Sequence, residues 1–388
     1  MKKLFIFTLI LMLVITGGTL ASDLKFGGKL EQKLEYTDSD EIVKGTTNLN
    51  LEITKEFGFD KKLYFNPEIN LDYNGDNSSE DNFKMDFKLK QGYFDLYLNK
   101  IDLRVGNQLI NWGSAFKINP TSVVNPIDYT VSDLDETRLP VNAVKGKYYH
   151  NYNTIISGVI ADFKSASIPD KIKSEQKMKL EEGLKAQLTE IISQSLSQTA
   201  AQQQADQLVN NSLSYHTVEP ELNGLKDLEY GFRLTKRNWN GYDVSLNYFN
   251  GYEDRPSLAS NLEQVTETLI QNPPARINYG YKQTQSLGIN IIGSIKEIGV
   301  WCETNYSYNE DEEAKLYTVL GGDYTCENNL YTVAQYFHRS YNNYEHNKSN
   351  LDFLMIQHKK PFRQIHEWKI TTVCDLNHDS LVVNPEMA

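Results

Sequence analysis

Apolar and polar residues alternate along most of the chain in runs of roughly ten residues, the length that a tilted strand needs to cross a bilayer. The clearest runs cover 49–54, 63–73, 83–90, 101–106 and 242–248. Because successive side chains of a β-strand point to opposite faces, a period of two indicates strands. The pattern therefore predicts strands with one apolar and one polar face.

The connections between these strands differ regularly in length. Those after even-numbered strands are tight, namely 58–61, 99–100, 150–152, 238–241, 296–297 and 327–329. Those after odd-numbered strands are longer, polar and variable. Short turns at one end and long loops at the other are typical of outer-membrane barrels. We predict an all-β fold, a transmembrane antiparallel up-and-down β-barrel of about sixteen strands. A soluble β-sandwich, the alternative, would show no such difference between loops.

Weaker alternation completes the set of strands. It places them at 24–36, 142–150, 154–163, 227–236, 275–295, 298–308, 315–325, 330–340, 351–360 and 364–375, with a last strand beginning near 380. The chain ends at Ala388, where that last strand has only begun. Because an open sheet edge cannot persist in lipid, we expect a chain truncated at its C-terminus. Closure by a short strand is the alternative.

The N-terminus predicts export. Lys2 and Lys3 precede an apolar run over 4–15, and small residues lie around Ala21. This order is that of a secretory signal peptide, which we assign to residues 1–21, with the barrel over 22–388. A transmembrane helix would need about 20 apolar residues. Export and barrel together predict the bacterial outer membrane, with lipid and lipopolysaccharide around the chain and the barrel-assembly machinery as its partner during biogenesis.

Two predicted external loops, 164–226 and 251–274, carry helical patterns. The apolar residues at helical spacing in the first are Leu180, Leu184, Leu188, Ile191 and Ile192, and those in the second are Leu262, Val265 and Leu269. An amphipathic helix must bury its apolar face. Two partners for these faces stay open: the barrel mouth, which the helices would plug, or the helices themselves, packed together above the membrane.

Composition narrows the chemistry. The formal net charge of −12 argues against a nucleic-acid partner, which would require a basic face. The 24 Tyr, 16 Phe and 4 Trp fit a barrel. The three cysteines have no metal-type spacing and predict free thiols rather than a disulfide. We find neither zinc spacing nor a Gly-rich phosphate loop, so no metal and no cofactor are predicted.

One stretch beyond the run at 101–106 combines a strand end with several turn residues. It reads Leu103-Arg104-Val105-Gly106-Asn107-Gln108, then Asn111-Trp112-Gly113, then Asn119-Pro120, then Val124-Asn125-Pro126-Ile127-Asp128. Trp-Gly and Asn-Pro fix turns, and Asp caps them. The stretch resembles the signature of an uncharacterised family of porin-like outer-membrane barrels, Gly-Arg-Gln, Trp-Gly-Glu and Asn-Pro-Val-Asp. That family is distantly similar to alginate-export channels.

The resemblance implies a loop that folds inward and narrows a pore. The residues that it assigns to this loop are Gln108, Trp112, Gly113, Asn125, Pro126 and Asp128. Asn107 stands where the family has Arg, and Ser114 stands where it has Glu, so we expect no charge-based role for that pair. A motif that only stabilises the barrel rim is the alternative.

Charged residues at the polar positions of the alternating strands predict a water-filled interior. They are Glu68, Asp72, Lys84, Asp86, Lys88, Asp102, Arg104, Glu229 and Arg233. On a lipid-facing position at mid-bilayer such a residue would cost about 2–4 kcal/mol. Facing rows of opposite charge would select solutes by size and charge. Cross-strand salt bridges that stiffen the wall are the alternative.

These patterns predict a porin-like channel for passive diffusion of small polar solutes, as a monomer or a homotrimer, and not an enzyme. A surface-binding or adhesion barrel that uses the helical insert is the main alternative. A phospholipase-like hydrolase is a remote one. His338 and Ser340 share a strand face, and an outer-membrane phospholipase resembles this in using His, Ser and Asn for acyl transfer.

Overall fold

The structure is a computed structural model, and it describes residues 24–36, 42–74, 83–131, 137–221, 224, 227–309, 312–342, 348–363 and 366–387. The predicted signal peptide lies outside these residues. No helix among them is long and apolar enough to span a membrane. The chain divides into two compact units. Unit 1 is Met1–Leu109 with Asn142–Tyr148, and unit 2 is Ile110–Val141 with Tyr149–Ala388.

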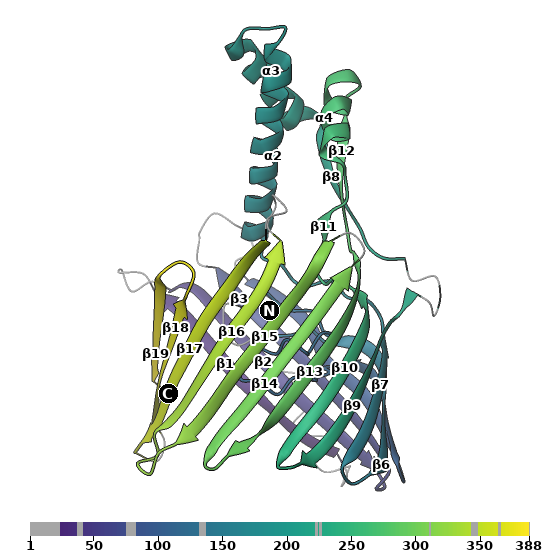
Figure 1. Cartoon of the computed structure of the whole chain (residues 1–388), viewed down its shortest axis with the longest axis vertical. Coiled ribbons are helices and arrows are strands. Elements are labelled where there is room, and N and C mark those ends of the chain that lie inside the picture. The colour runs from purple at the N-terminus through teal and green to yellow at the C-terminus, as the bar shows by residue number, and fades with distance from the viewer. Residues whose placement is uncertain are drawn as a thin grey trace. The chain divides into compact units, whose positions relative to one another are not determined.

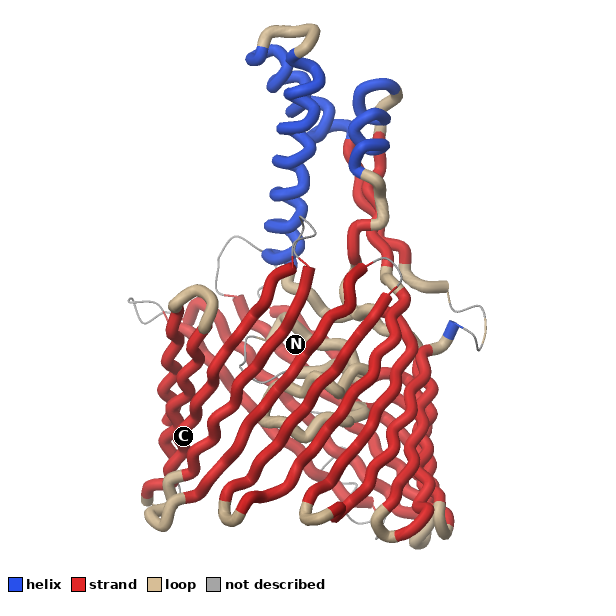
Figure 2. Tube along the Cα trace, in the orientation of Figure 1, coloured by secondary structure: helices blue, strands red, loops and turns tan. Residues whose placement is uncertain are grey.

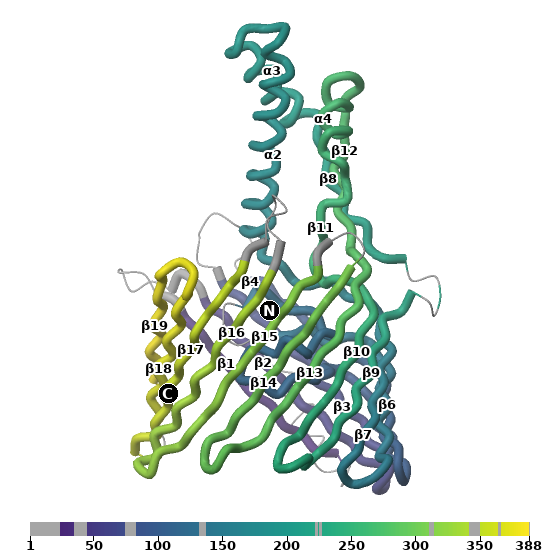
Figure 3. Tube along the Cα trace, in the orientation of Figure 1, coloured from purple at the N-terminus to yellow at the C-terminus, as the bar shows by residue number. Residues whose placement is uncertain are grey.

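Sixteen strands form one antiparallel sheet in which neighbours in the sequence are hydrogen-bonded neighbours, an order that the colours of Figure 3 follow. The strands, most of them labelled in Figure 1, are β1 (Leu24–Tyr36), β2 (Ile42–Phe57), β3 (Lys61–Asn74), β4 (Phe83–Leu98), β5 (Ile101–Gln108), β6 (Val141–Asn151), β7 (Thr154–Ala161), β9 (Glu229–Trp239), β10 (Tyr242–Tyr252), β13 (Gln283–Ile295), β14 (Ile298–Asn309), β15 (Glu312–Thr325), β16 (Tyr331–Asn342), β17 (Lys348–Phe362), β18 (His366–Asp375) and β19 (Ser380–Met387). The predicted fold class and strand number are confirmed.

The sheet keeps the predicted alternation. In unit 1, the exposed side chains of Phe83, Phe87 and Val105 lie on one face. On the other face, Glu68 lies opposite Lys88 across the β3–β4 ladder. We refer below to the apolar face and the polar face of the sheet. The period of two therefore decides which residues meet water and which meet an apolar surrounding.

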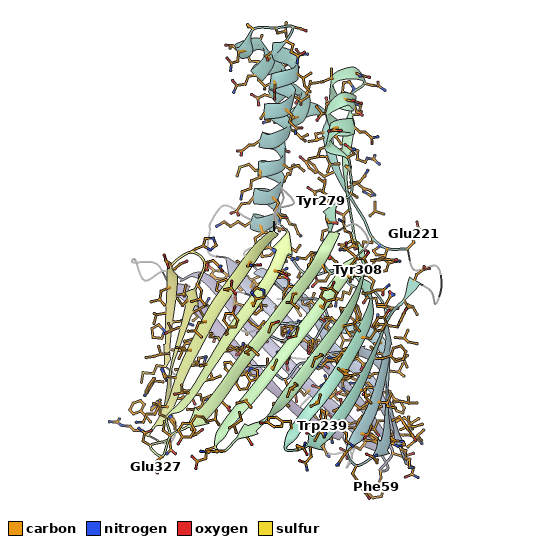
Figure 4. The ribbon with its side chains drawn as sticks, viewed as in Figure 1. Phe59, Glu221, Trp239, Tyr279, Tyr308 and Glu327 are labelled. Carbon is orange, nitrogen blue, oxygen red and sulfur yellow. The ribbon has the colours of Figure 1, made fainter. Side chains whose placement is uncertain are left out.

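Tight turns join the strands at one end of the sheet. Gly58, Gly241, Lys296 and Asn329 there have φ of 69°, 90°, 56° and 62°, in the left-handed region that tight hairpin turns require. In Figure 4 the labelled Trp239 and Glu327 lie at this end of their strands, and Tyr308 lies at the other end. The predicted long connection between β14 and β15 is wrong, because both strands extend further and leave only two residues between them.

The predicted strand 275–295 is also wrong as a single strand. It consists of β12 (Ala275–Gly280) and β13, and β12 does not join the main sheet. Instead, β12 pairs in parallel with β8 (Leu213–Val218) and antiparallel with β11 (Ser257–Leu258). Both parts bury alternate side chains, so the hydrophobic pattern runs through the break and does not reveal it.

The two inserts form a helical head, which we define as residues 170–218 and 257–280. Its helices are α2 (Asp170–Ser193), α3 (Gln198–Ser212) and α4 (Leu262–Gln271). The core that they share with β8 and β12 contains Leu184, Leu188, Ala205, Val209, Val265, Leu269, Ala275 and Ile277. Ile191, predicted on the apolar face of α2, is instead exposed. The two inserts bury their apolar faces against each other.

Deleting residues 170–218 should therefore unfold the rest of the head. The deletion removes α2, α3 and β8, which cover Val265, Leu269 and Ile277. Limited proteolysis should cleave 257–280 in this variant and leave it intact in the full chain. A second deletion, which removes both parts of the head, is the control. The rest of the chain in this control should resist the protease. Continued resistance of 257–280 in the first variant would contradict a shared core.

Candidate functional site

Segment 110–128, which follows β5, lies on the polar face of unit 2. Its described contacts reach β9, β13, β14 and β16 through side chains of the sheet and backbone groups of the segment. Figure 2 shows loop in tan behind the strands of the sheet. The segment has no regular helix or strand, so its position depends on these contacts.

The carboxylate of Glu303 on β14 is the main anchor. Its Oε1 accepts hydrogen bonds from the backbone N–H of Ser114 and, at 2.6 Å, of Ala115. Its Oε2 accepts from the Thr121 backbone N–H at 3.3 Å and from the Thr121 hydroxyl at 3.0 Å. Asn290 Nδ2 on β13 donates to Oε1 at 2.9 Å. The side chain is 0% exposed, so bonds from five donors satisfy a charge that would otherwise be costly to bury.

Gln335 on β16 fixes the tip of the segment. Its Oε1 accepts from the Phe116 backbone N–H at 3.1 Å, and its Nε2 donates to the Phe116 carbonyl at 2.8 Å. The same Oε1 accepts from Trp301 Nε1 at 2.8 Å. Next to this bond, Ala115 packs against Trp301 and Val319 in a small apolar cluster. The tip is therefore held by paired hydrogen bonds and by buried apolar contact.

Trp112 fixes the beginning of the segment. Its indole fills the space beside Gly231 of β9, where an added Cβ would come within 2.4 Å of Cη2. Its carbonyl accepts a hydrogen bond from Arg233, also on β9. Arg233 donates in addition to the Ser245 hydroxyl at 2.9 Å. A glycine and an arginine two residues apart on one strand thus hold the ring and the backbone of Trp112.

Asn125 joins the two ends of the loop. Its Oδ1 accepts from the Ile110 N–H at 2.7 Å, and its Nδ2 donates to the Leu139 carbonyl at 2.8 Å. The Leu139 N–H donates in turn to the Pro126 carbonyl at 2.8 Å. Arg138 Nη1 donates to the Asn125 carbonyl at 2.6 Å. The Asn-Pro turn therefore holds the outgoing and returning backbone together.

Gly113 and Asp128, two more of the predicted loop residues, also have local roles. The Gly113 N–H donates to the Ser122 hydroxyl at 2.9 Å, and an added Cβ at Gly113 would collide with Asn119 at 2.4 Å. Asp128 Oδ1 accepts from the Thr130 N–H at 3.0 Å, as a turn-capping aspartate does. Nearby, burial lowers the pKa of Lys164, and the Asp128 carboxylate opposes that shift.

Gln108 differs from the other predicted loop residues. It is the last residue of β5, in unit 1, and is fully buried. Its Nε2 donates to the Ala143 carbonyl of β6 at 2.8 Å, so it supports the end of a strand. Of the two departures from the resemblance, Asn107 donates weakly to the Leu89 carbonyl at 3.4 Å, and the Ser114 hydroxyl donates to Asn290 Oδ1 at 2.7 Å.

Sequence reasoning missed Glu303, Asn290 and Gln335. A signal for them was present, because each occupies one of the alternate positions of its strand that face the polar side of the sheet. Glu303, for example, lies between Cys302 and Thr304, which point to the opposite face. What the sequence did not show is which polar residue of which strand would meet segment 110–128.

The predicted charges in unit 1 lie on the polar face, and several are paired. Arg104 donates to the two oxygens of Asp95 at 2.6 and 2.9 Å, and its guanidinium lies 3.7 Å from the centre of the Tyr93 ring. Glu68 forms a salt bridge with Lys90. The remaining predicted charges follow the same ladders: Asp72 lies opposite Lys84, Lys88 is 3.4 Å from Asp86, and Asp102 lies opposite Tyr97. This wall therefore includes cross-strand salt bridges.

Glu229, predicted on the polar parity of β9, is buried and accepts a hydrogen bond from the Tyr252 N–H at 2.9 Å. An added Cβ at Gly251 would lie 2.6 Å from its Oε1. Glu229 is therefore enclosed between β9 and β10, whereas Arg233, four residues later, contacts segment 110–128.

The predicted hydrolase residues lie on the apolar face. His338 Nδ1 lies 2.8 Å from Asp352 Oδ1, and the Ser340 hydroxyl accepts a hydrogen bond from the Leu316 N–H at 2.9 Å. Among the described residues, no group of three or more His, Cys, Asp or Glu could hold a metal ion. Cys302, Cys326 and Cys374 are free thiols.

Comparison with known proteins identifies the family and the fold. A family model described as "Protein of unknown function (DUF1302)" matches residues 25–353. That description agrees with the predicted resemblance to an uncharacterised family, while the motif as its signature stays a prediction. A comparison with curated proteins found no match.

Solved structures with a similar fold are outer-membrane proteins. A loop L8 deletion mutant of OmpT, an outer membrane protein of Vibrio cholerae, has a TM-score of 0.50 at 9% identity over 94% of this chain and 97% of that one. The outer membrane channel DcaP of Acinetobacter baumannii has 0.45 at 10% identity over 94% and 95%. Salmonella typhi OmpF, in a complex with daunomycin, has 0.47 at 7% identity over 94% and 97%. The likeness to the OmpT variant concerns the fold, and it agrees with the predicted outer-membrane location.

Proposed function

The chain belongs to the DUF1302 family, and we propose that it forms a porin-like channel for passive diffusion of small polar solutes across the bacterial outer membrane. One observation carries the proposal. Segment 110–128 is held on the polar face of the sheet by Glu303, Gln335 and Arg233. A sheet that only anchored a binding protein would have no need of a loop built onto this face.

The two faces of the sheet meet different surroundings in this proposal. Exposed side chains such as Leu246, Leu287 and Ile289 face lipid, where burial of apolar surface is favourable. Aromatic residues lie near both ends of the strands, for example Tyr308 at one end and Trp239 at the other, as girdles at the two interfaces do. The polar face then lines an aqueous passage.

Segment 110–128 is the constriction in this proposal. Trp112, Gly113, Asn125, Pro126 and Asp128 keep its backbone in place, and Gln108 supports the strand from which it leaves. Since these contacts are intramolecular and need no ligand, the constriction is preformed. Solutes would then be selected by size at the segment and by charge along the wall.

The wall favours neutral and zwitterionic solutes over multiply charged ones. Arg104 and Glu68, which a solute would otherwise meet as single charges, are each paired with an opposite charge. Pairing reduces the net field that either charge exerts on a passing solute. Several buried polar residues of unit 2, among them Asn247, Asn305 and Gln357, are amides without charge.

A liposome-swelling assay tests the proposal. Liposomes that contain the folded chain should swell in isotonic solutions of small neutral sugars, at rates that fall steeply as sugar size increases. Protein-free liposomes and liposomes with the heat-denatured chain are the controls. Folded chain that gives no swelling with the smallest sugar would refute diffusion through the sheet.

A surface-binding function is the second candidate, because the helical head has a hydrophobic core of its own. An adhesion barrel would lose cell or ligand attachment when the head is deleted. The rate at which liposomes with this barrel swell would then have no bearing on its function. A channel would keep its sugar flux after the same deletion. Comparing attachment and flux in one deletion variant therefore separates the two functions.

A further inference from the structure

A row of polar side chains crosses four neighbouring strands on the apolar face of unit 2. In the ladders of β14 to β17, Thr304 lies opposite Thr318, Thr318 lies opposite His338, and His338 lies opposite Asp352. Across β13, β10 and β9 the same row continues with Ile289, Leu246 and Leu234, which are large, apolar and exposed. The polar row is therefore specific to one part of the wall.

The side chains of the row are bonded to one another. The Thr304 and Thr318 hydroxyls are 3.2 Å apart, and His338 Nδ1 lies 2.8 Å from Asp352 Oδ1. The Tyr336 hydroxyl donates to the same Asp352 oxygen at 2.5 Å. Each hydroxyl and each imidazole keeps further hydrogen-bonding capacity beyond these contacts. The other Asp352 oxygen accepts from Asn377 Nδ2, in the turn after β18, at 3.2 Å. In hydrocarbon the remaining capacity of the Thr304 and Thr318 hydroxyls would be unsatisfied, at a cost that apolar residues avoid.

Small residues lie beside the row. Gly322 of β15 lies opposite Ala334 of β16, on the same apolar face. Small side chains let a second protein surface approach the backbone closely. Lipid chains gain nothing from such an approach, because they adapt to bulky and small side chains alike.

We propose that the apolar face of β14–β17 is the contact surface for a second copy of this chain, with the polar row at its centre. The proposal rests on the membrane-spanning sheet of the proposed function. A second copy presents the same His338, Asp352, Thr304 and Thr318. Hydroxyl and imidazole groups of one copy can therefore donate to the hydroxyls and the carboxylate of the other across the contact. Anionic lipid headgroups fit less well, because they select clusters of Lys and Arg and the row has only His338 as a base.

The test is the subunit number of the chain after mild extraction from outer membranes, measured by native mass spectrometry. Wild-type chain should give a single oligomer. Ala334→Trp places a large side chain in the proposed contact and should convert it entirely to monomer, and Thr318→Trp should do the same. Val105→Trp, at an exposed position on the apolar face of unit 1, is the control and should leave the oligomer unchanged.

Folding of every variant is checked by heat-dependent gel migration, and sugar flux is measured on the same samples. A wild-type chain that is monomeric would overturn the proposal. So would an oligomer that survives both β14–β17 substitutions, or one that Val105→Trp dissolves equally well. Flux bears on the channel alone: an oligomer without flux would refute the proposed function and leave the contact surface in place.

Discussion

Replacing Glu303 with Gln should free segment 110–128 from the polar face and raise the size limit for solutes. The amide keeps one acceptor oxygen and places an N–H₂ group where the other oxygen was, so either the Ser114 and Ala115 N–H donors or the Thr121 donors lose their acceptor. Leaving a buried N–H donor without an acceptor typically costs about 1–3 kcal/mol. Because the sheet does not depend on the segment for its ladders, this loss should displace the segment and leave the strands in place.

The liposome assay measures this result directly. Sugars that wild-type chain excludes should enter through the Glu303→Gln variant, while flux of the smallest sugar rises less. Glu327→Gln, in the exposed turn between β15 and β16, is the control and should keep the wild-type size limit. An unchanged limit in a folded Glu303→Gln variant would show that the carboxylate does not position the constriction.

Gly231→Val should destabilise the chain, because position 231 of β9 lies against Trp112. Its side chain would meet the Trp112 indole, whose nearest atom lies 2.4 Å from the position of the new Cβ. Overpacking of a well-packed site costs about 1–3 kcal/mol. The indole must leave its position, and the backbone contact between Arg233 and Trp112 is lost with it.

The midpoint of heat-dependent unfolding in detergent is the measurement for this variant, and it should fall. Trp112→Ala in the same chain should restore part of the loss, since it removes the colliding ring. Gly158→Val is the matched control, because an added Cβ there makes only ordinary contacts of 3.8 Å with Phe232. Equal destabilisation by both valines would show that Trp112 does not account for the effect.

The fold could be predicted because its signal is local. Alternation in runs such as 63–73 and 242–248 reports burial of one face, and tight turns such as Lys296-Glu297 separate the strands. The signal fails where two segments with the same alternation are joined by a short link. The break between β12 and β13 at Tyr281-Lys282 is such a link, and only the pairing of β12 with β8 reveals it.

The site could be predicted in part. Asn125 and Asp128 could be predicted because their hydrogen bonds join residues close in the sequence, whereas the ring of Trp112 is held by Gly231 and its carbonyl by Arg233, both on distant β9. Glu303 could not be predicted, because it lies 189 residues from its partner Ser114, and the sheet register that brings them together depends on every intervening strand. The carboxylate that the resemblance expected at position 114 is absent from the segment, and a carboxylate from the wall contacts the segment instead.

The central claim, a channel with a preformed constriction, is tested most directly by single-channel current recordings of the full folded chain in planar bilayers. We predict discrete current steps of uniform size, which persist when the helical head is deleted. Folding of both forms is checked by heat-dependent gel migration. The absence of current steps, both with and without the head, would contradict the channel and favour the surface-binding function.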